Sequence, residues 1–270
     1  MAATAKKVRV SHGLSQLLSS DPGQIILHAV EAVQEQAHHR RLGRVLKQLQ
    51  RRKESIGWIH VSDAYDPCDR VLGAKLLGYK LPREAPGPRL QRIFENGTYM
   101  HLRWYNAFLS LPPPYEVAVA VLLRDWPIIG EADVIVKHPA FNQFIIELKS
   151  INGEQFKALK GSKSDHQQQL NSYLGLDESG VDQGLVWYEC KNTQDVKIYS
   201  EQFDPEPYYQ ARGRIERIAD LILHGRLPMP CGVCNLDEYI GELQGIEERM
   251  ATMKEVRDTW QKLIAPQTIS

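Results

Sequence analysis

Gly130-Glu-Ala-Asp133 and, after thirteen intervening residues, Glu147-Leu-Lys149 are the two segments that decide how this chain folds. They lie within two stretches rich in β-branched and aliphatic residues, 128–136 and 143–149. Such stretches predict β-strands, and the intervening His138-Pro-Ala marks a turn between them. The two segments are therefore expected on neighbouring strands of one sheet.

The alternation of side chains along a strand determines what these residues do together. Residues i and i+2 of a strand face the same side, so Glu147 and Lys149 project together while Leu148 points into the opposite layer. If the two strands pair antiparallel, Asp133 lies beside Glu147. Two carboxylates and a lysine then meet at one end of the sheet.

Two carboxylates held this close repel each other unless a cation compensates their charge. A divalent ion does so, and oxygen ligands suit Mg²⁺ or Mn²⁺. Such an ion polarises a phosphoryl oxygen and lowers the pKa of a bound water, while a lysine orients that water or stabilises charge on the phosphate. A single Asp or a lone Glu-x-Lys is more commonly an exposed strand position, so the interpretation depends on the surrounding sequence.

Further elements are predicted on both sides of these strands. Residues 116–123 predict a preceding strand and residues 164–176 a Gln-rich helix. Two later strands are expected at 183–189 and 195–200. Other helices are expected at about 25–53, 90–109, 205–225 and 235–263. This order predicts an α/β fold with a mixed central sheet of about five strands flanked by helices.

The composition fits a globular protein with a sizeable core, since 43% of the 270 residues are hydrophobic and 24% charged. Lys plus Arg and Asp plus Glu each total 33, so the net charge is zero and any nucleic-acid-binding surface must be local. No apolar run reaches the roughly 18–20 residues of a membrane helix, and the sequence does not begin with a secretory signal. With four cysteines and no disulfide pattern, we expect a cytoplasmic protein without a membrane partner.

Further short motifs occur in a definite order around the two central segments. Gly97-x-x-x-His101 precedes the sheet, Glu116 lies on its first strand, and Gln169-x-x-x-Tyr173 follows on the next helix. In this order the sequence resembles the PD-(D/E)XK nuclease superfamily over about residues 60–235. More narrowly it is similar to the RecB-type branch, which includes the RecB and AddB nuclease domains and cluster-bearing exonucleases of CRISPR adaptation and of phages.

The resemblance implies a restriction-endonuclease-like core and a divalent metal site with ligands from a helix and two strands: His101, Asp133, Glu147 and the backbone carbonyl of Leu148. It implies that Lys149 is the catalytic lysine. Gln169 and Tyr173 lie four residues apart on one helical face and would steady the site or touch DNA. Without the resemblance, His101 would be interpreted as a buried structural histidine, and the other two as an ordinary helix rim.

The cysteines resemble part of a second pattern of this branch, which has one cysteine before the nuclease core and three after it. Cys68 occupies the first position, and Cys231 and Cys234 form a Cys-x-x-Cys pair after the core. A third downstream cysteine is missing, and Cys190 is a doubtful substitute. Three interpretations remain: an iron–sulfur cluster, a structural zinc with a ligand such as His224, or a site that has lost its metal.

Basic residues near these motifs predict contacts with phosphates. Lys157, Lys160 and Lys163 follow the second catalytic strand in a predicted loop that contains Gly153 and Gly161. A second basic run, which includes Arg40 and Arg44, lies on the helix expected at 25–53. Such runs are often merely solvated helix faces, but neutralising phosphates also drives non-specific DNA affinity.

Together these features predict three regions: an N-terminal arm with a basic helix at 1–57, a nuclease core with a helical insertion at 58–235, and a C-terminal helix at 236–270. The expected activity is a metal-dependent exonuclease that hydrolyses DNA from single strands or strand ends. Its setting would be recombination, replication or repair in a bacterial or phage-infected cell, together with the proteins of those processes. The alternatives are a structure-specific or restriction-like endonuclease, or an inactive DNA-binding module. The oligomeric state is open, and the last helix could pack on the core or mediate self-association.

Overall fold

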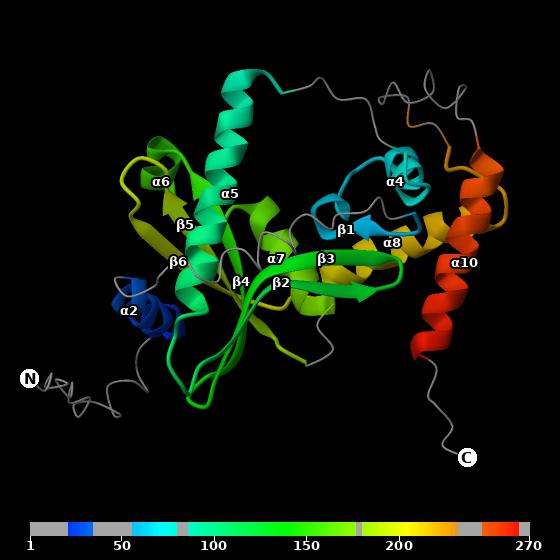
Figure 1. Ribbon diagram of the computed structural model, residues 1–270. Coiled ribbons are helices and arrows are strands. Elements are labelled where there is room, and N and C mark those ends of the chain that lie inside the picture. The colour runs from blue at the N-terminus through cyan, green and yellow to red at the C-terminus, as the bar shows by residue number, and fades with distance from the viewer. Residues whose placement is uncertain are drawn as a thin grey trace, which may run out of the picture.

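The computed structural model describes residues 21–34, 56–79, 86–176, 180–229, 231 and 245–264. Its centre is a six-stranded mixed sheet with helices on both faces (Figure 1). None of the described helices combines the length and apolar character that crossing a bilayer requires. The predictions for Arg40, Arg44 and Cys234 concern positions outside the described residues.

The strands follow the predicted order. β2 (Glu116–Asp125), β3 (Ile128–His138) and β4 (Asn142–Ile151) form an antiparallel meander. β5 (Gln183–Cys190) lies parallel to β4, and β6 (Val196–Gln202) lies antiparallel to β5. A short strand β1 (Ile59–His60) pairs parallel with the start of β3.

Two groups of helices cover the sheet. α2 (Pro22–Gln34) and α5 (Pro88–Phe108) pack on one face, while α4 (Asp69–Leu76), α7 (Ser164–Leu176) and α8 (Pro205–Leu223) pack on the other. Between β4 and α7 lies the short helix α6 (Gly153–Ala158), and the described chain ends in α10 (Ile246–Ile264). The order α5, β2–β3–β4, α7, β5 is the restriction-endonuclease-like α/β core expected from the sequence.

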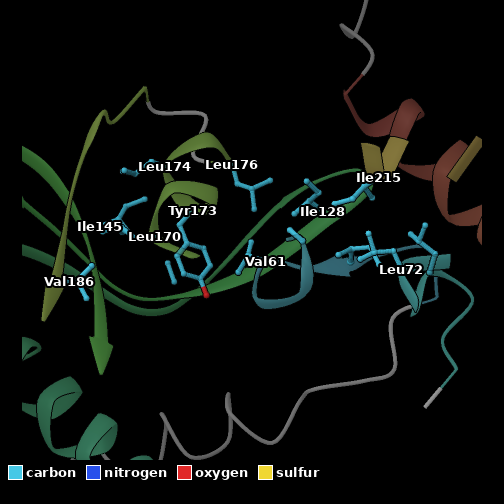
Figure 2. Packing of buried hydrophobic residues seen from close by; sticks show 14 of the residues in the cluster. Val61, Leu72, Ile128, Ile145, Leu170, Tyr173, Leu174, Leu176, Val186 and Ile215 are labelled. Carbon is cyan, nitrogen blue, oxygen red and sulfur yellow. The ribbon is translucent and has the colours of Figure 1, made fainter. Parts of the chain in front are cut away.

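The alternation of β4 explains how both faces become buried. Phe144, Ile146 and Leu148 face α2 and α5, whereas Ile145 faces the helices of the opposite side. Figure 2 shows the hydrophobic cluster on the face covered by α4, α7 and α8, where Leu170 and Tyr173 of α7 contact the sheet. Removing each such side chain from water stabilises the fold by about 1.5–3 kcal/mol.

Three local features differ from the expectation. The sheet has six strands rather than about five, because β1 is only two residues long and carries no period-two pattern of its own. Residues 153–158 form α6 where a loop was expected, with the Asn152 side chain accepting a hydrogen bond from the N–H of Gln155 at 2.9 Å. α10 begins at Ile246 after the turn residue Gly245, whereas a helix was expected at 235–263, whose positions 235–244 lie outside the described residues.

α10 packs on the core, which was one of the two roles predicted for the last helix. Met253 is fully buried, and the ring of Trp260 meets that of Trp58 edge-on at a centroid distance of 5.6 Å. Arg249 donates hydrogen bonds to the carbonyl oxygens of Leu77 and Gly78, just after α4. The helix is thereby joined to the segments that precede and follow α4.

Candidate active site

The site lies where β3 and β4 part. Their antiparallel pairing runs from His138–Asn142 to Val134–Ile146 and stops there. The next position along this register would pair Asp133 with Glu147. Instead of a ladder bond, the N–H of Leu148 donates to Asp133 Oδ2 at 2.9 Å. The carboxylate of Asp133 therefore satisfies the backbone group that the ending ladder leaves unpaired.

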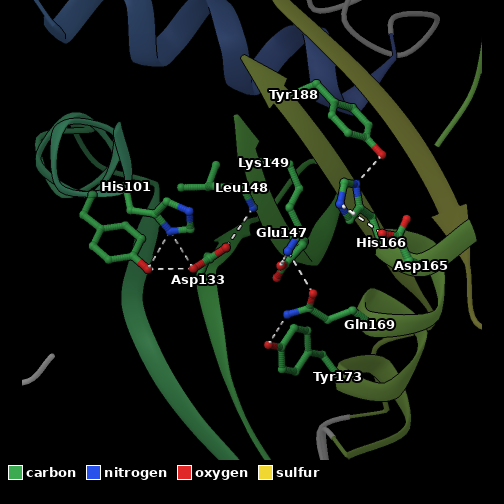
Figure 3. A network of polar contacts seen from close by, with 11 residues as sticks. His101, Asp133, Glu147, Leu148, Lys149, Asp165, His166, Gln169, Tyr173 and Tyr188 are labelled. Carbon is green, nitrogen blue, oxygen red and sulfur yellow. Dashed lines mark hydrogen bonds and ion pairs between the residues drawn. The ribbon is translucent and has the colours of Figure 1, made fainter. Parts of the chain in front are cut away.

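Helix α5 supplies two partners for the other oxygen of this carboxylate. The hydroxyl of Tyr105 donates to Asp133 Oδ1 at 2.7 Å, and His101 Nδ1 lies 3.0 Å from the same oxygen. His101 and Tyr105 are four residues apart, so they share a helical face. α5 thus holds both side chains against Asp133 in the middle of β3, and Figure 3 shows His101 beside Asp133.

A local change in the sheet brings Asp133 to this position. Ala132 packs with the α7 side and Val134 with the α5 side, although residues two apart on a regular strand share a face. The pairing of β2 with β3 is interrupted at the same level, between Val119–Val134 and Val121–Ala132. Ala120, opposite Asp133, has φ +51°. This irregularity lets Asp133 reach both α5 and the end of β4.

On the α7 side, a chain of hydrogen bonds holds the lysine. Lys149 Nζ lies 2.6 Å from Glu147 Oε1 and donates to Gln169 Oε1 at 2.8 Å. The amide nitrogen of Gln169 in turn donates to the hydroxyl of Tyr173 at 2.9 Å. Figure 3 shows the lysine between the glutamate and this pair on α7. The contacts fix the ammonium group beside the carboxylate that shares its strand face.

The two carboxylates have opposite pKa shifts. Burial alone would raise the pKa of Asp133, but the charge of His101 and hydrogen bonds from His101, Tyr105 and Leu148 N–H hold it below its ordinary value. Burial and the negative charge of Asp133 raise the pKa of Glu147 to about 7, although Lys149 acts in the opposite direction. Without a further cation, Glu147 is therefore only partly ionised at neutral pH.

The same two carboxylates raise the pKa values of their cationic partners, His101 and Lys149. Burial lowers the pKa of His101, but the charge of Asp133 outweighs it and raises the pKa above its ordinary value. Burial also lowers the pKa of the Lys149 ammonium group. The nearby carboxylates of Glu147 and Asp133 outweigh this effect and raise that pKa above its ordinary value. The metal-free site thus compensates its negative charge with protein cations.

The donor set fits a hard divalent cation. Glu147 is buried, and its Oε2 has no hydrogen-bond partner. One carboxylate oxygen is thus left for a ligand beside the Asp133 carboxylate, the combination that Mg²⁺ and Mn²⁺ prefer. Among the described residues, no group of three or more His, Cys, Asp or Glu side chains is arranged to hold a metal ion. In this arrangement His101 Nδ1 lies 3.0 Å from Asp133 Oδ1.

A cavity of about 600 Å³ opens onto these groups. Its walls include the carboxylates, Lys149 and Glu131, together with Phe94 and other residues of α5. A larger hollow of about 780 Å³ lies beside α6 and contains no part of the carboxylate site. The smaller cavity is therefore the candidate active site.

The three lysines after β4 that were predicted to contact phosphates do not line this cavity. Lys157, on α6, lines the larger hollow instead, and Lys160 is exposed beyond that helix. The backbone N–H of Lys163 donates to the Tyr188 hydroxyl at 2.9 Å, beside the start of α7. Glu116 does not join the site, since it pairs with Lys137 and lies four residues along β2 from the position opposite Asp133.

Three residues near the site were not predicted from the sequence. Tyr105 lies four residues after His101, and Glu131 lies two before Asp133, so helix and strand periodicity were the available signals. His166 lies three residues before Gln169 on α7 and bonds to Tyr188 at 2.9 Å. Burial and the charge of Lys149 lower the pKa of His166 to about 4, so it is neutral at pH 7.

The structure brings two of the four cysteines together. The sulfur atoms of Cys68 and Cys231 are 3.2 Å apart, although the residues are separated by 163 positions. A hydrogen bond of 2.6 Å from Arg70 to the carbonyl of Pro228 joins the same two segments. Cys190 lies at the end of β5 and lines the larger hollow beside α6, and Figure 1 shows α6 and α4 toward opposite ends of the sheet. It is not brought to the Cys68–Cys231 pair.

Comparisons with known proteins give structural likeness only. No protein-family model and no curated protein sequence matches the chain. Among solved structures, an alkaline exonuclease from Laribacter hongkongensis aligns with TM-score 0.44 and 13% identity, over 77% of this chain and 95% of its own. A phage-related exonuclease from Haemophilus somnus aligns with TM-score 0.39 and 13% identity over 59% and 90%. The protein SSO0001 aligns with TM-score 0.41 and 19% identity over 65% and 83%.

Proposed function

We propose that the chain is a divalent-metal-dependent deoxyribonuclease that hydrolyses phosphodiester bonds in the cavity beneath α5. The observation that carries this proposal is the buried Glu147 carboxyl group, whose unpaired Oε2 lies beside Asp133 and whose other oxygen contacts Lys149. A buried pair of carboxylates with shifted pKa values destabilises the fold unless cations compensate its charge, and such pairs occur preferentially at functional sites. A catalytic lysine held against such a pair is suited to phosphoryl chemistry.

Asp133, Glu147, His101 and the carbonyl of Leu148 would hold Mg²⁺ or Mn²⁺, which supplies charge compensation on the phosphate and a lower pKa for a bound water. The chain's own groups supply the rest. Lys149 presents its ammonium group to the attacking water or to the phosphate oxygens, and Gln169 keeps it in place. Tyr173 holds the amide of Gln169, and Tyr105 keeps Asp133 aimed at the cavity.

The finer proposal is an exonuclease that acts on single strands or strand ends in recombination, replication or repair. The order of the motifs from Gly97 to Tyr173 supports it, because this order resembles the RecB-type branch. A restriction-like or structure-specific endonuclease, and an inactive DNA-binding module, are the competing activities. In all three cases Lys163 near the start of α7 would contact phosphates, with Lys157 and Lys160 further along the same segment.

Circular and linear DNA separate these activities. The protein is incubated with closed circular plasmid, with the same plasmid linearised, and with circular single-stranded DNA, in Mg²⁺, Mn²⁺ or EDTA. An exonuclease degrades only the linear form and only with a divalent ion. Nicking or linearisation of the circles would identify an endonuclease, and binding without cleavage in any ion would identify the inactive module.

The cysteines support a proposal about structure rather than catalysis. Cys68 and Cys231 would bind a structural iron–sulfur cluster or zinc ion together with Cys234 and a further ligand. Two thiol groups within 3.2 Å from distant parts of the chain are a donor set that suits such soft metals. The bound metal would link the start of α4 to the segment after α8.

A further inference from the structure

The outer half of α5 exposes apolar side chains. From Pro88 to Tyr99 every residue except Gly97 is exposed, and Figure 1 shows this end of the helix extending beyond the sheet. Four large apolar residues lie here with exposures of 38–68%: Leu90, Ile93, Phe94 and Tyr99. Exposed apolar groups gathered in one place mark an interaction site more often than isolated ones do.

One face of α5 connects these side chains to the catalytic residues. Residues three or four apart share a face, and the following positions do so in sequence: Leu90, Phe94, Gly97, His101 and Tyr105. Ile93 and Phe94 line the same cavity as the carboxylates. Phe94 precedes His101 by seven residues, which corresponds to roughly 10 Å along the helix axis. The apolar face is therefore an outward continuation of the active site.

Gly97 leaves room between these two parts of the face. A Cβ atom at this position would meet only Ser150 Oγ, at 3.9 Å. Glycine in a helix interior is less stable than alanine, so a glycine without a packing reason suggests that the space serves something else. The open space lies in the wall of the catalytic cavity. A ligand extending from His101 toward Phe94 would pass over it.

The neighbouring face of α5 carries positive charge. It includes these residues, again in steps of three or four: Arg89, Arg92, Asn96, Tyr99 and Arg103. Tyr99 and Arg103 line a second cavity of about 360 Å³. Ser150 and Lys191 line both this cavity and the catalytic one, so the two adjoin. Aromatic rings beside cationic groups next to a phosphate-cleaving site match the chemistry of a nucleic-acid strand.

We propose that the outer half of α5 is a nucleobase-binding subsite, where unpaired DNA bases stack on Phe94 and pack on Ile93. This proposal rests on the nuclease function above, because its occupant is the strand that enters the catalytic cavity. The face of a base is accessible only where the strand is unpaired, so the subsite selects single-stranded DNA over duplex. Arg92 and Lys191 contact the phosphates of the same strand. Sequence preference is weak, since every base has a face that can stack.

The test compares base-bearing with abasic DNA. A labelled single-stranded oligonucleotide, an abasic oligonucleotide of equal length and charge, and a blunt duplex are titrated by fluorescence anisotropy. The protein carries Lys149→Ala and Mg²⁺ is present, so that no cleavage occurs. Phe94→Ala is added, and Tyr209→Ala serves as the matched control because Tyr209 is an equally exposed aromatic residue on α8. Phe94→Leu keeps an apolar side chain without the ring.

Phe94→Ala is expected to weaken binding of the base-bearing strand about tenfold, an effect in the range measured for one stacked base. The affinity of Phe94→Ala for the abasic strand and for the blunt duplex changes less than twofold. Phe94→Leu shows an intermediate loss of affinity for the base-bearing strand. Tyr209→Ala binds all three DNAs with unchanged affinity. Equal losses on base-bearing and abasic strands, or no loss on either, would overturn the subsite. A loss on blunt duplex as large as on the single strand would overturn the selection for unpaired bases.

Two controls separate this proposal from its alternatives. If Phe94→Ala changes the oligomeric state in light scattering and leaves DNA affinity unchanged, the face joins copies of the chain and the proposal fails. Cleavage is measured separately in protein that retains Lys149. If the protein cleaves DNA but its binding does not depend on the bases, only the subsite proposal is contradicted. If binding depends on the bases but no cleavage occurs, the nuclease function is contradicted and the subsite remains as a DNA-binding surface.

Discussion

Asp133 accepts the backbone N–H of Leu148 at 2.9 Å, so a side chain of β3 takes the place of the ladder bond that β3 and β4 no longer make. This contact gives the Asp133 carboxylate a structural role in addition to the metal-binding role proposed for it. It positions the group between α5 and β4, and it satisfies a buried donor. The two roles respond differently to substitution.

Asp133→Asn and Asp133→Ala separate these roles. Asparagine keeps an acceptor for the N–H of Leu148 but loses the charge, so we expect DNA cleavage to fall at least about 100-fold with little loss of stability. Alanine leaves the N–H unpaired and should lower the free energy of unfolding by a further 1–3 kcal/mol or so. Urea unfolding in EDTA measures the difference. Equal stability of the two variants would contradict the structural role.

Glu147→Gln is expected to stabilise the metal-free protein at high pH. Burial and Asp133 raise the pKa of Glu147 from 4.5 to about 7, so ionising this group opposes folding as the pH rises above 4.5. At pH 8 in EDTA the variant should therefore be more stable by about 1–2 kcal/mol, because each pKa unit corresponds to about 1.4 kcal/mol and the lost contact with Lys149 offsets part of the gain.

At pH 5 wild-type Glu147 is already protonated, so the stability difference should disappear. Glu154→Gln is the matched control, because Glu154 is an exposed carboxylate on α6. It should show no such pH dependence. A Glu147→Gln variant that is less stable than wild type at pH 8 would mean that the contact with Lys149 dominates over burial and repulsion.

Gln169→Ala and Tyr173→Phe test the chain that holds the lysine. Gln169 contacts Lys149 directly, so its removal should lower kcat about 10–100-fold while the metal concentration needed for half-maximal activity stays unchanged. Tyr173→Phe keeps the buried ring and removes only the acceptor of the Gln169 amide, so its effect on kcat should be below about tenfold. Single-turnover cleavage measures both. A larger effect of Tyr173→Phe than of Gln169→Ala would contradict this order.

Cys68→Ser tests the proposed structural metal. Protein purified without oxygen should contain iron with acid-labile sulfide, or else zinc, as measured by elemental analysis and absorption spectra. Cys68→Ser should lose that metal and unfold at a lower temperature, because the link from α4 to Cys231 is broken. Cys190→Ser is the control and should keep the metal. Wild-type protein without bound metal, or a Cys190→Ser variant that loses it, would contradict the assignment.

The sequence was sufficient to predict the strands and the convergence of Asp133, Glu147 and Lys149, because period-two alternation and antiparallel pairing are local rules. It could not predict that Tyr105 bonds Asp133, since helix periodicity places the ring on the right face but does not show what lies opposite. The irregularity at Asp133 depends on Ala120 of the neighbouring strand. That relationship becomes visible only when the register of β2 and β3 is known.

Residues with weak local signals were also missed. β1 consists of only Ile59 and His60, too short for a strand pattern, and it pairs with Ile128 and Ile129 of β3. The exposed apolar side chains of α5 were predicted as part of a helix, but periodicity gives no reason for them to lie outside the core. Ile93 and Phe94 line the cavity that contains Asp133, Glu147 and Lys149, and this position, known only from the structure, is what makes Phe94 interpretable.

The central claim is that Lys149 acts with a metal held by Asp133 and Glu147, and end-labelled DNA tests it most directly. Wild-type protein and Lys149→Ala are incubated with linear single-stranded and double-stranded DNA in Mg²⁺, Mn²⁺ or EDTA, after circular dichroism has shown that both are folded. We predict shortening from one end by the wild-type protein, only with a divalent ion, and a loss of at least about 1000-fold in the variant. Cleavage by wild type in EDTA, or cleavage by Lys149→Ala at the wild-type rate, would contradict the account.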